Sequence, residues 1–250
     1  MLKKFLLLLS VAAGNYCFAQ YSPLKTPGPS PAPVVSADDL ARLTDDRRGE
    51  QTASDERISV VRLSHKPSRK ARAAFSRGWN LAKNDACQEA AAEFEKAVAL
   101  DPEFSEAFGD LGVEYTCLGR WEQAVTAFRR AIQIDPATAH HAANLAFALL
   151  QLKRYEEAKS EAEAAISLDA GNANAQFLLG YLLARHPETR QLSESHLTFA
   201  AKTVPEAHFV LALVYRFQGA AQRANAELDL YRSATKKSSP TGAMSFLPTP

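Results

Sequence analysis

The sequence predicts an all-α fold assembled from stacked helix pairs, and three observations support this prediction. A pattern of apolar and small residues recurs every 34 residues from residue 71 onward. Within each copy the apolar residues follow the 3.6-residue period of an α-helix rather than the alternation of a strand. Small residues recur at positions where two packed helices would need to approach closely. Together these features favour a linear repeat array over a domain with one central core.

The clearest copy spans residues 105–138, where eight residues stand at fixed intervals. They are Phe108, Leu111, Gly112, Tyr115, Ala124, Phe128, Ala131 and Pro136. The spacing is aromatic-x2-Leu-Gly-x2-Tyr, then Ala-x3-Phe-x2-Ala, then Pro. This spacing resembles the tetratricopeptide repeat (TPR), a helix–turn–helix unit of 34 residues. The resemblance implies a right-handed α-α superhelix of about five TPR helix pairs, because stacking buries apolar faces that one pair leaves exposed.

We expect five copies, with boundaries near 71–104, 105–138, 139–172, 173–204 and 205–234. Phe94 aligns the first copy, and the third keeps the alanines of the pattern but has Ala170 in place of the proline. The fourth is degenerate because His186 and Pro187 interrupt its first helix. Thr138 and Asn172 are expected to cap the helices that follow them.

The first nineteen residues have the layout of a secretory signal peptide. Lys3 and Lys4 precede an apolar run from residue 5 to 13, and Cys17-Phe18-Ala19 resembles a cleavage site. A retained membrane anchor is the alternative, but the apolar run from residue 5 to 18 is short of the ~20 residues that a spanning helix needs. We therefore expect an exported protein, periplasmic or secreted. No other apolar stretch is long enough to span a bilayer, so we expect no membrane span after cleavage.

Composition changes divide the rest of the chain. Residues 20–57 are rich in proline and polar residues, which predicts a disordered linker. Residues 58–70 are expected to form an extended lead-in segment to a TPR domain at 71–235. Residues 236–250 are expected to form a disordered tail. The whole chain, residues 1–250, has 29 basic and 28 acidic residues, a balance that does not favour nucleic-acid binding.

The sequence offers no pattern that calls for catalysis, a metal or another cofactor. His140 and His141 are adjacent, so their side chains point apart on a helix. No glycine-rich phosphate loop or nucleophile motif appears. The resemblance instead implies a non-catalytic protein–protein interaction scaffold that binds a peptide or protein segment. The alternative is a periplasmic chaperone-like factor, or a cell-envelope assembly or transport factor, that holds client proteins. The oligomeric state stays open.

The resemblance also implies where a partner would bind, because first helices of such repeats line the concave groove of the superhelix. The residues at the groove positions, including aromatic anchors with basic neighbours, are Arg72, Phe75, Trp79, Lys83, His140, Asn144, Phe147, Phe177, Tyr181 and Arg185. Exposed aromatic surface on a soluble repeat protein is typical of an interaction site. Aromatic anchors with basic neighbours suit a peptide with apolar side chains and some negative charge.

Two cysteines lie within the repeats. Cys87 is expected to open the second helix of the first copy, and Cys117 to close the first helix of the second copy. Antiparallel packing would bring those two helix ends to the same side of the stack. Either the two residues form a disulfide, which requires Cα atoms within about 7 Å, or they remain separate, partly buried thiols.

Overall fold

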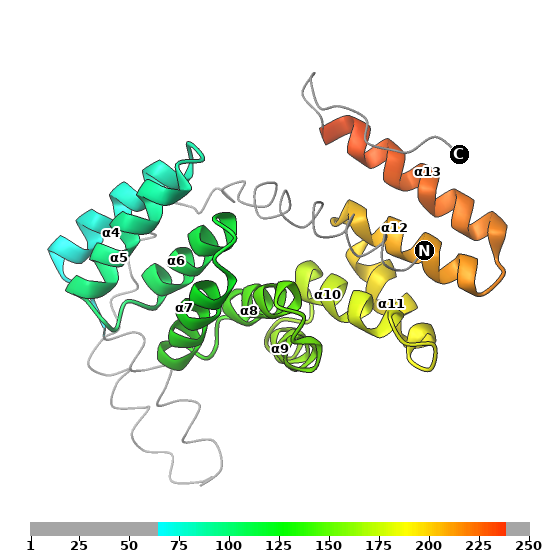
Figure 1. Cartoon of the computed structure of the whole chain (residues 1–250), viewed down its shortest axis with the longest axis horizontal. Coiled ribbons are helices and arrows are strands. Elements are labelled where there is room, and N and C mark those ends of the chain that lie inside the picture. Colours follow the sequence, from blue (N-terminus) through cyan, green and yellow to red (C-terminus); the bar gives the residue numbers. More distant parts are fainter. Residues whose placement is uncertain (1–64, 239–250) are drawn as a thin grey trace, which may run out of the picture.

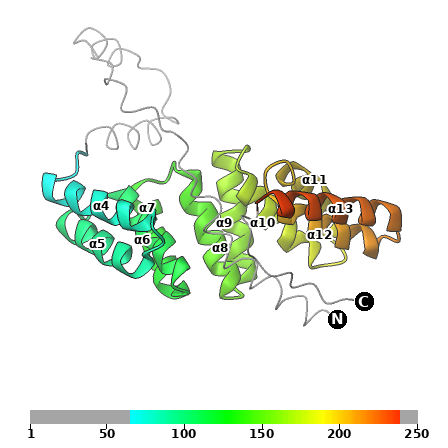
Figure 2. The ribbon, with the colours of Figure 1, turned by 90° about the horizontal axis from the view of Figure 1, so that it is seen from above.

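The computed structural model describes residues 65–238, and within that range the chain forms ten α-helices and no strand (Figure 1). The helices are α4 (Arg69–Ala82), α5 (Cys87–Leu100), α6 (Ser105–Cys117), α7 (Trp121–Ile134), α8 (Ala139–Gln151), α9 (Tyr155–Leu168), α10 (Ala173–Ala184), α11 (Arg190–Ala200), α12 (Pro205–Phe217) and α13 (Ala221–Ser238). They form five antiparallel pairs that follow one another along an arc. Figure 2 shows the same pairs in line, from α4 at one end to α13 at the other. The all-α prediction of five helix pairs is confirmed.

The two ends of the array differ slightly from the sequence-based boundaries. Ser68 caps α4 with its side chain, which accepts a hydrogen bond from the Ala71 amide, so residues 69–70 are helical rather than extended. At the other end α13 continues to Ser238, three residues beyond the predicted domain end. The predicted signal peptide, the linker, residues 58–64 and residues 239–250 lie outside the described range.

The two predicted helix caps behave differently. The Asn172 side chain accepts a hydrogen bond from the Ala175 amide at the start of α10, as expected. Thr138 occupies the cap position of α8 but makes no such bond, because its hydroxyl donates to the Asp135 carboxylate instead. Asp135 also accepts from the Ala137 amide, so this aspartate holds the turn between α7 and α8.

Within a pair, the turn between the two helices usually contains one residue with positive φ. These residues are Asp85 (60°), Gly119 (68°), Lys153 (61°) and Gly219 (77°). In the fourth pair, Pro187 lies 34 residues after Lys153, and its ring fixes φ near −65°. That connection therefore takes another path, with five residues between α10 and α11 against three between α8 and α9. This backbone restriction is the physical reason why the fourth copy is degenerate.

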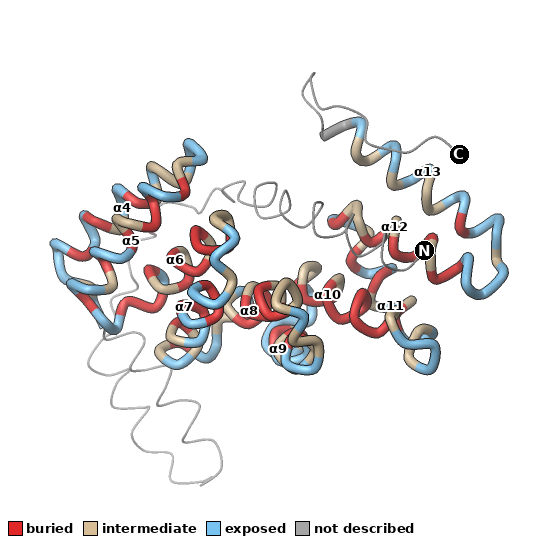
Figure 3. The backbone as a smooth tube through the Cα atoms, viewed as in Figure 1, coloured by how far each residue is buried: buried red, intermediate tan, exposed pale blue. Residues whose placement is uncertain are grey.

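In the first, second and fourth pairs, the two helices touch where a glycine meets a large side chain. A Cβ added to Gly112 would lie 2.6 Å from the Phe128 ring, and one added to Gly78 would lie 2.9 Å from the Phe94 ring. Phe94 and Phe128 are almost fully buried at these contacts. Figure 3 shows how burial is distributed along the array, with buried residues between helices and exposed residues on the outside. The rings occupy the space that side chains on the first helices would otherwise fill.

Replacing Gly112 with alanine is therefore expected to destabilise the protein by about 1–3 kcal/mol, because the new methyl group overlaps the Phe128 ring in a packed core. Urea unfolding followed by circular dichroism would measure the change. The matched control is Gln123→Ala at an exposed position of α7, which should change stability by no more than about 0.5 kcal/mol. Equal stability of the Gly112→Ala and wild-type proteins would contradict the close approach of α6 and α7.

The positive-φ turns predict two substitutions with opposite effects. Gly119→Ala is expected to destabilise by about 1–2 kcal/mol, because a side chain is strained in the left-handed region. Lys153→Gly, at the equivalent turn of the next pair, is expected to stabilise by up to about 1 kcal/mol by relieving that strain. Thermal unfolding of both variants should show midpoints that move in opposite directions. A shift of both midpoints in the same direction would be inconsistent with this account of the turns.

Candidate functional site

In the middle of the array, the first helices of the pairs lie on the inside of the arc. In Figure 1, α6 and α8 lie on the inner side of the curve, whereas α7 and α9 lie on the outer side. The ten candidate residues belong to α4, α8 and α10 and to the residues directly after α4 and α10. Their exposure differs strongly from one helix to the next, so the structure divides the predicted site into accessible and buried parts.

On α4 the structure keeps a basic residue next to an aromatic ring. The Lys83 ammonium lies 3.2 Å from the centroid of the half-buried Trp79 ring, and both Lys83 and Arg72 are exposed. Phe75 is partly buried and also packs against the core. Its ring packs 4.9 Å from Phe104 and 5.4 Å from Phe94, centroid to centroid. Phe75 therefore helps to fill the end pair, and its role as a groove anchor stays a prediction.

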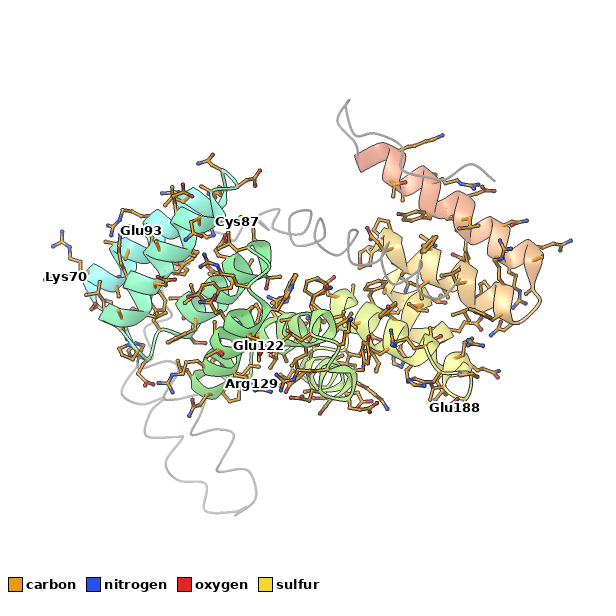
Figure 4. All side chains as sticks on the ribbon, viewed as in Figure 1. Lys70, Cys87, Glu93, Glu122, Arg129 and Glu188 are labelled. Carbon is orange, nitrogen blue, oxygen red and sulfur yellow. A yellow bond between two sulfur atoms is a disulfide. The ribbon has the colours of Figure 1, made fainter. Side chains whose placement is uncertain are left out.

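The first helix also carries an unbalanced positive charge. No acidic residue occurs between residues 65 and 84. Within the described part of the chain, five exposed basic residues of this segment have no carboxylate within 4 Å; they are Lys66, Arg69, Lys70, Arg72 and Lys83. Figure 4 shows Lys70 reaching away from the array at its free end. This segment, residues 66–83, is called the basic end below.

The outer face has the opposite character, because its charges are paired. The Arg129 guanidinium lies 2.9 Å from the Glu157 carboxylate, and Arg154 lies 2.6 Å from the same carboxylate. Hydrogen bonding from Arg154 is the main cause that lowers the pKa of Glu157. Arg154 also approaches Glu122 at 3.8 Å, and Figure 4 shows Glu122 and Arg129 on α7. Ion pairs between α7 and α9 leave little unbalanced charge there for a partner.

Of the three candidates on α8, two line the accessible surface. His140 is exposed at the start of the helix, and Asn144 is partly exposed one turn later. Phe147 is partly buried, and its ring meets the Trp121 ring edge-on with centroids 6.1 Å apart. Trp121 belongs to the preceding pair, so Phe147 contributes to the junction between pairs as well as to the inner surface.

On α10 the prediction fails for Tyr181. Its side chain is only 5% exposed and belongs to the main core, and burial raises the pKa of its hydroxyl. Phe177 stacks against it with centroids 6.5 Å apart and keeps part of its own surface exposed. The physical reason is position in the array, because α10 packs against α8, α9, α11 and α12. A tyrosine in the middle of the array is covered from both sides.

A recurring contact joins successive pairs and accounts for Arg185. The first residue of a second helix meets the residue at or just after the end of the next first helix. At the third junction the Arg185 guanidinium lies 3.8 Å from the Tyr155 ring centroid, and at the fourth Arg190 lies 4.4 Å from the Phe217 ring centroid. Arg185 is thus partly occupied by the junction contact. A 30-residue spacing, as between residues 155 and 185, is the sequence signal of this contact.

The same position at the first junction holds a covalent bond. Cys87 begins α5 and Cys117 ends α6, and the structure joins them by a disulfide with Cα atoms 6.4 Å apart. Figure 4 shows Cys87 where α5 faces α6. Of the two alternatives open from the sequence, the structure therefore contains the bonded one. The disulfide fastens the pair that carries the basic end to the second pair.

A buried carboxylic acid lies beside this disulfide, and sequence reasoning missed it. A carboxylate oxygen of Glu114 and the Sγ atoms of Cys87 and Cys117 all lie within 4.8 Å of one another. The Glu114 residue is 6% exposed. Burial, followed by the charges of Asp110 and Asp85, raises the pKa of its carboxyl to about 7. Its place three residues before Cys117, on the same helix face, was the signal that could have found it.

Glu114 is expected to make stability depend on pH. Its pKa is near 4.5 in the unfolded chain and about 7 in the folded chain, so the unfolded state loses this proton first as the pH rises. Stability from this group is therefore present below about pH 4.5 and is lost as the pH rises through about 7. Between about pH 5 and pH 8, wild type should lose about 2–3 kcal/mol more than Glu114→Gln.

Urea unfolding of both proteins at the two pH values would measure this difference, because all other titrating groups are common to them. The exposed acid Glu106 on the same helix provides the control substitution, Glu106→Gln, which should behave like wild type. Parallel pH dependence of wild type and Glu114→Gln would show that Glu114 titrates normally.

Two further structural facts bound the chemistry. No helix in the described range is long and apolar enough to cross a membrane. Of the ten groove candidates only Tyr181 is buried, and the other nine keep part of their surface exposed.

Comparison with known proteins agrees with this geometry. Residues 105–138 and residues 142–172 each match a model described as tetratricopeptide repeat. No curated protein matches the chain. Among solved structures, MamA (residues 41 to end) from Desulfovibrio magneticus RS-1 is similar, with 18% identity and a TM-score of 0.59 over 70% of this chain and 100% of that chain.

Two other solved structures show the same fold similarity. YrrB, described as a TPR protein with an unusual peptide-binding site, has 17% identity and a TM-score of 0.54, over 72% of this chain and 93% of its own. TTC0263, a thermophilic TPR protein in Thermus thermophilus, has 22% identity and a TM-score of 0.53, over 66% of this chain and 99% of its own. At these identities the similarity concerns the fold.

Proposed function

We propose that this chain, a tetratricopeptide repeat protein, is a non-catalytic scaffold that binds a peptide or protein segment on the inner face of its helix array. The observation that carries the proposal is the basic end. Lys66, Arg69, Lys70 and Arg72 have no carboxylate within 4 Å among the described residues, in a chain whose overall charge is only +1. Unbalanced surface charge attracts a partner of opposite sign.

The neighbouring aromatic surface indicates what else the partner carries. Trp79, with the Lys83 ammonium over its ring, provides an apolar contact next to positive charge. Phe147 and Phe177 each keep part of their surface exposed further along the inner side. The partner that fits is a segment with acidic residues at one end and apolar side chains along its length. The description of YrrB as a TPR protein with a peptide-binding site gives this proposal a precedent within the same fold.

We further propose that the protein acts outside the cytoplasm, in the periplasm or as a secreted protein. The signal-like N-terminus predicts export, and the Cys87–Cys117 disulfide supports it. Disulfides form and persist mainly in oxidising compartments. Fractionation of cells expressing the full chain, with N-terminal sequencing of the mature protein, tests this point. Recovery of the uncleaved chain in the cytoplasm would contradict it.

A second function, holding client proteins in the cell envelope, is favoured by one observation. Phe217 is 64% exposed and Leu192 is 61% exposed, and both lie in the last two pairs. Exposed apolar side chains of this size suit weak contact with many unfolded segments. Such a factor would bind many apolar peptides weakly, whereas a scaffold would retain one or two partners.

The inner-face proposal is tested with a charge-reversal variant, Arg72→Glu/Lys83→Glu, in the full chain. Purification from the exported fraction after mild crosslinking, followed by mass spectrometry, would identify partners of the wild-type protein. We expect one or two partners that contact the inner face, and at least about tenfold weaker recovery with this variant, because charge complementarity is replaced by repulsion.

The matched control is Lys96→Glu/Arg129→Glu, which reverses the same number of charges on exposed positions of the second helices α5 and α7. These residues make exposed ion pairs that contribute about 0–1 kcal/mol, so folding should be retained. Partners that survive the control and vanish with the inner-face variant support the proposal. Loss of the partners with both variants would attribute binding to overall charge and overturn the inner-face assignment.

A further inference from the structure

The two cysteines of the disulfide at the first junction differ in their exposure. Cys117 is partly exposed, whereas Cys87 is buried at 9% exposure. A thiol or thiolate from solution can therefore reach Cys117 more readily than Cys87. When an external thiolate attacks one sulfur of a disulfide, the other sulfur leaves with the electron pair. The geometry makes Cys87 the leaving sulfur.

The surroundings of Cys87 disfavour a negative charge on that leaving sulfur. The carbonyl oxygen of Asp85 lies 3.6 Å from its Sγ atom, and the Glu114 carboxyl lies within 4.8 Å. The Asp85 carbonyl oxygen, and the Glu114 carboxyl when it is ionised, suit a protonated thiol as hydrogen-bond donor and oppose a thiolate. A buried thiolate next to oxygens would be costly, so the bond opens readily only when a proton arrives as the sulfur leaves.

Glu114 is the group placed to deliver that proton. The charges acting on its carboxyl are those of Asp110 on its own helix and Asp85 in the turn before α5, both negative, so they favour the protonated form. No basic residue is among the groups that shift the pKa of Glu114. Arg120, in the turn between α6 and α7, donates a hydrogen bond to Gln88 at 3.0 Å. A buried acid without an ion-pair partner destabilises the fold, and titratable groups of this kind cluster at functional sites.

We propose that Cys87–Cys117 is a site of thiol–disulfide exchange with dithiols, and that Glu114 protonates the Cys87 sulfur as the disulfide opens. This inference is independent of the partner proposed above. It assigns a chemical activity to the junction and a proton donor to that activity.

The exchange consists of two successive thiolate attacks. A thiolate of the external dithiol attacks Cys117 Sγ, a mixed disulfide forms, and the bond between the two cysteine sulfurs breaks. The electron pair goes to Cys87 Sγ, which takes the proton of Glu114. The second thiolate of the reagent then attacks its partner sulfur in the mixed disulfide, and Cys117 leaves and takes a proton from water. The protein gains two thiols, the dithiol becomes a cyclic disulfide, and Glu114 recovers its proton from water.

The consequence for the array is the loss of its one disulfide cross-link within the described residues. After exchange the pair α4–α5, which carries the basic end, is joined to the rest by the chain itself and by non-covalent contacts, chiefly the packing of α5 on α6. In a repeat array each pair contacts only its neighbours, so a terminal pair with a weakened junction separates more readily than an internal one.

The test is the pH dependence of disulfide reduction by dithiothreitol in the folded full chain, followed by alkylation and mass spectrometry. The rate depends on the thiolate fraction of the reagent and on protonated Glu114. For wild type the logarithm of the rate should rise with pH up to about 7 and then flatten, because Glu114 ionises there. For Glu114→Gln the rate should be at least about tenfold lower at about pH 6, and should keep rising with pH above 7.

Two further variants separate proton donation from simple charge effects. Asp85→Asn keeps a residue type that tolerates positive φ and removes one negative charge, so the bend in the wild-type profile should move to lower pH. Glu106→Gln, exposed on the same helix, should leave the profile unchanged. Circular dichroism and the thermal midpoint confirm that each variant is folded.

Three results would overturn the proposal. The first is a Glu114→Gln rate equal to wild type at about pH 6 but faster at about pH 8, which would mean that ionised Glu114 only repels the reagent. The second is the same pH profile for wild type and Glu114→Gln. The third is resistance of the wild-type disulfide to dithiothreitol until the protein unfolds.

Discussion

The close approach of the two helices in each pair is the constraint on which the rest of the molecule depends. Gly112 has no side chain where the Phe128 ring lies, and Gly180 has none where Leu197 lies. A helix pair with this contact buries large side chains between its helices, and it presents a regular face to the next pair. Gly109 allows a similar close approach between successive pairs, because an added Cβ would overlap the His141 ring. The curve of the array, and with it the inner face, follows from these contacts.

The same packing decides which inner-face residues remain available to a partner. An internal helix such as α10 is covered by the pairs on both sides, so Tyr181 becomes core. The terminal helix α4 has a neighbour on one side only, so Arg72 and the basic residues around it stay exposed. Accessibility along a repeat array is therefore uneven even when the sequence pattern is uniform. The most available charge lies at the end of the array that the disulfide fastens.

The first junction combines features that would each be unfavourable alone. Glu114 is desolvated among acidic neighbours, which raises its pKa, and Asp85 holds a positive φ that costs energy for any residue other than glycine. Both lie beside the Cys87–Cys117 disulfide, whose covalent bond holds the junction together despite these costs. The other junctions use weaker contacts, such as Arg185 over the Tyr155 ring. The strained backbone of Asp85 and the buried carboxyl of Glu114 thus both occur at the junction that a covalent bond cross-links.

The sequence by itself determined the fold class, the number of helix pairs and the degenerate fourth pair. It could do so because 34-residue spacing and helical periodicity are local properties, and because Pro187 restricts its own backbone whatever surrounds it. The helical pattern also made Trp79, Lys83 and His140 candidates for the groove. Only the tertiary structure decided that Tyr181 lies in the core and that Phe75 packs against it, that Cys87 meets Cys117, and that Glu114 lies beside them. Burial and pairing depend on residues about 30 positions away and on how many neighbours a helix has, and a helical period carries information on neither.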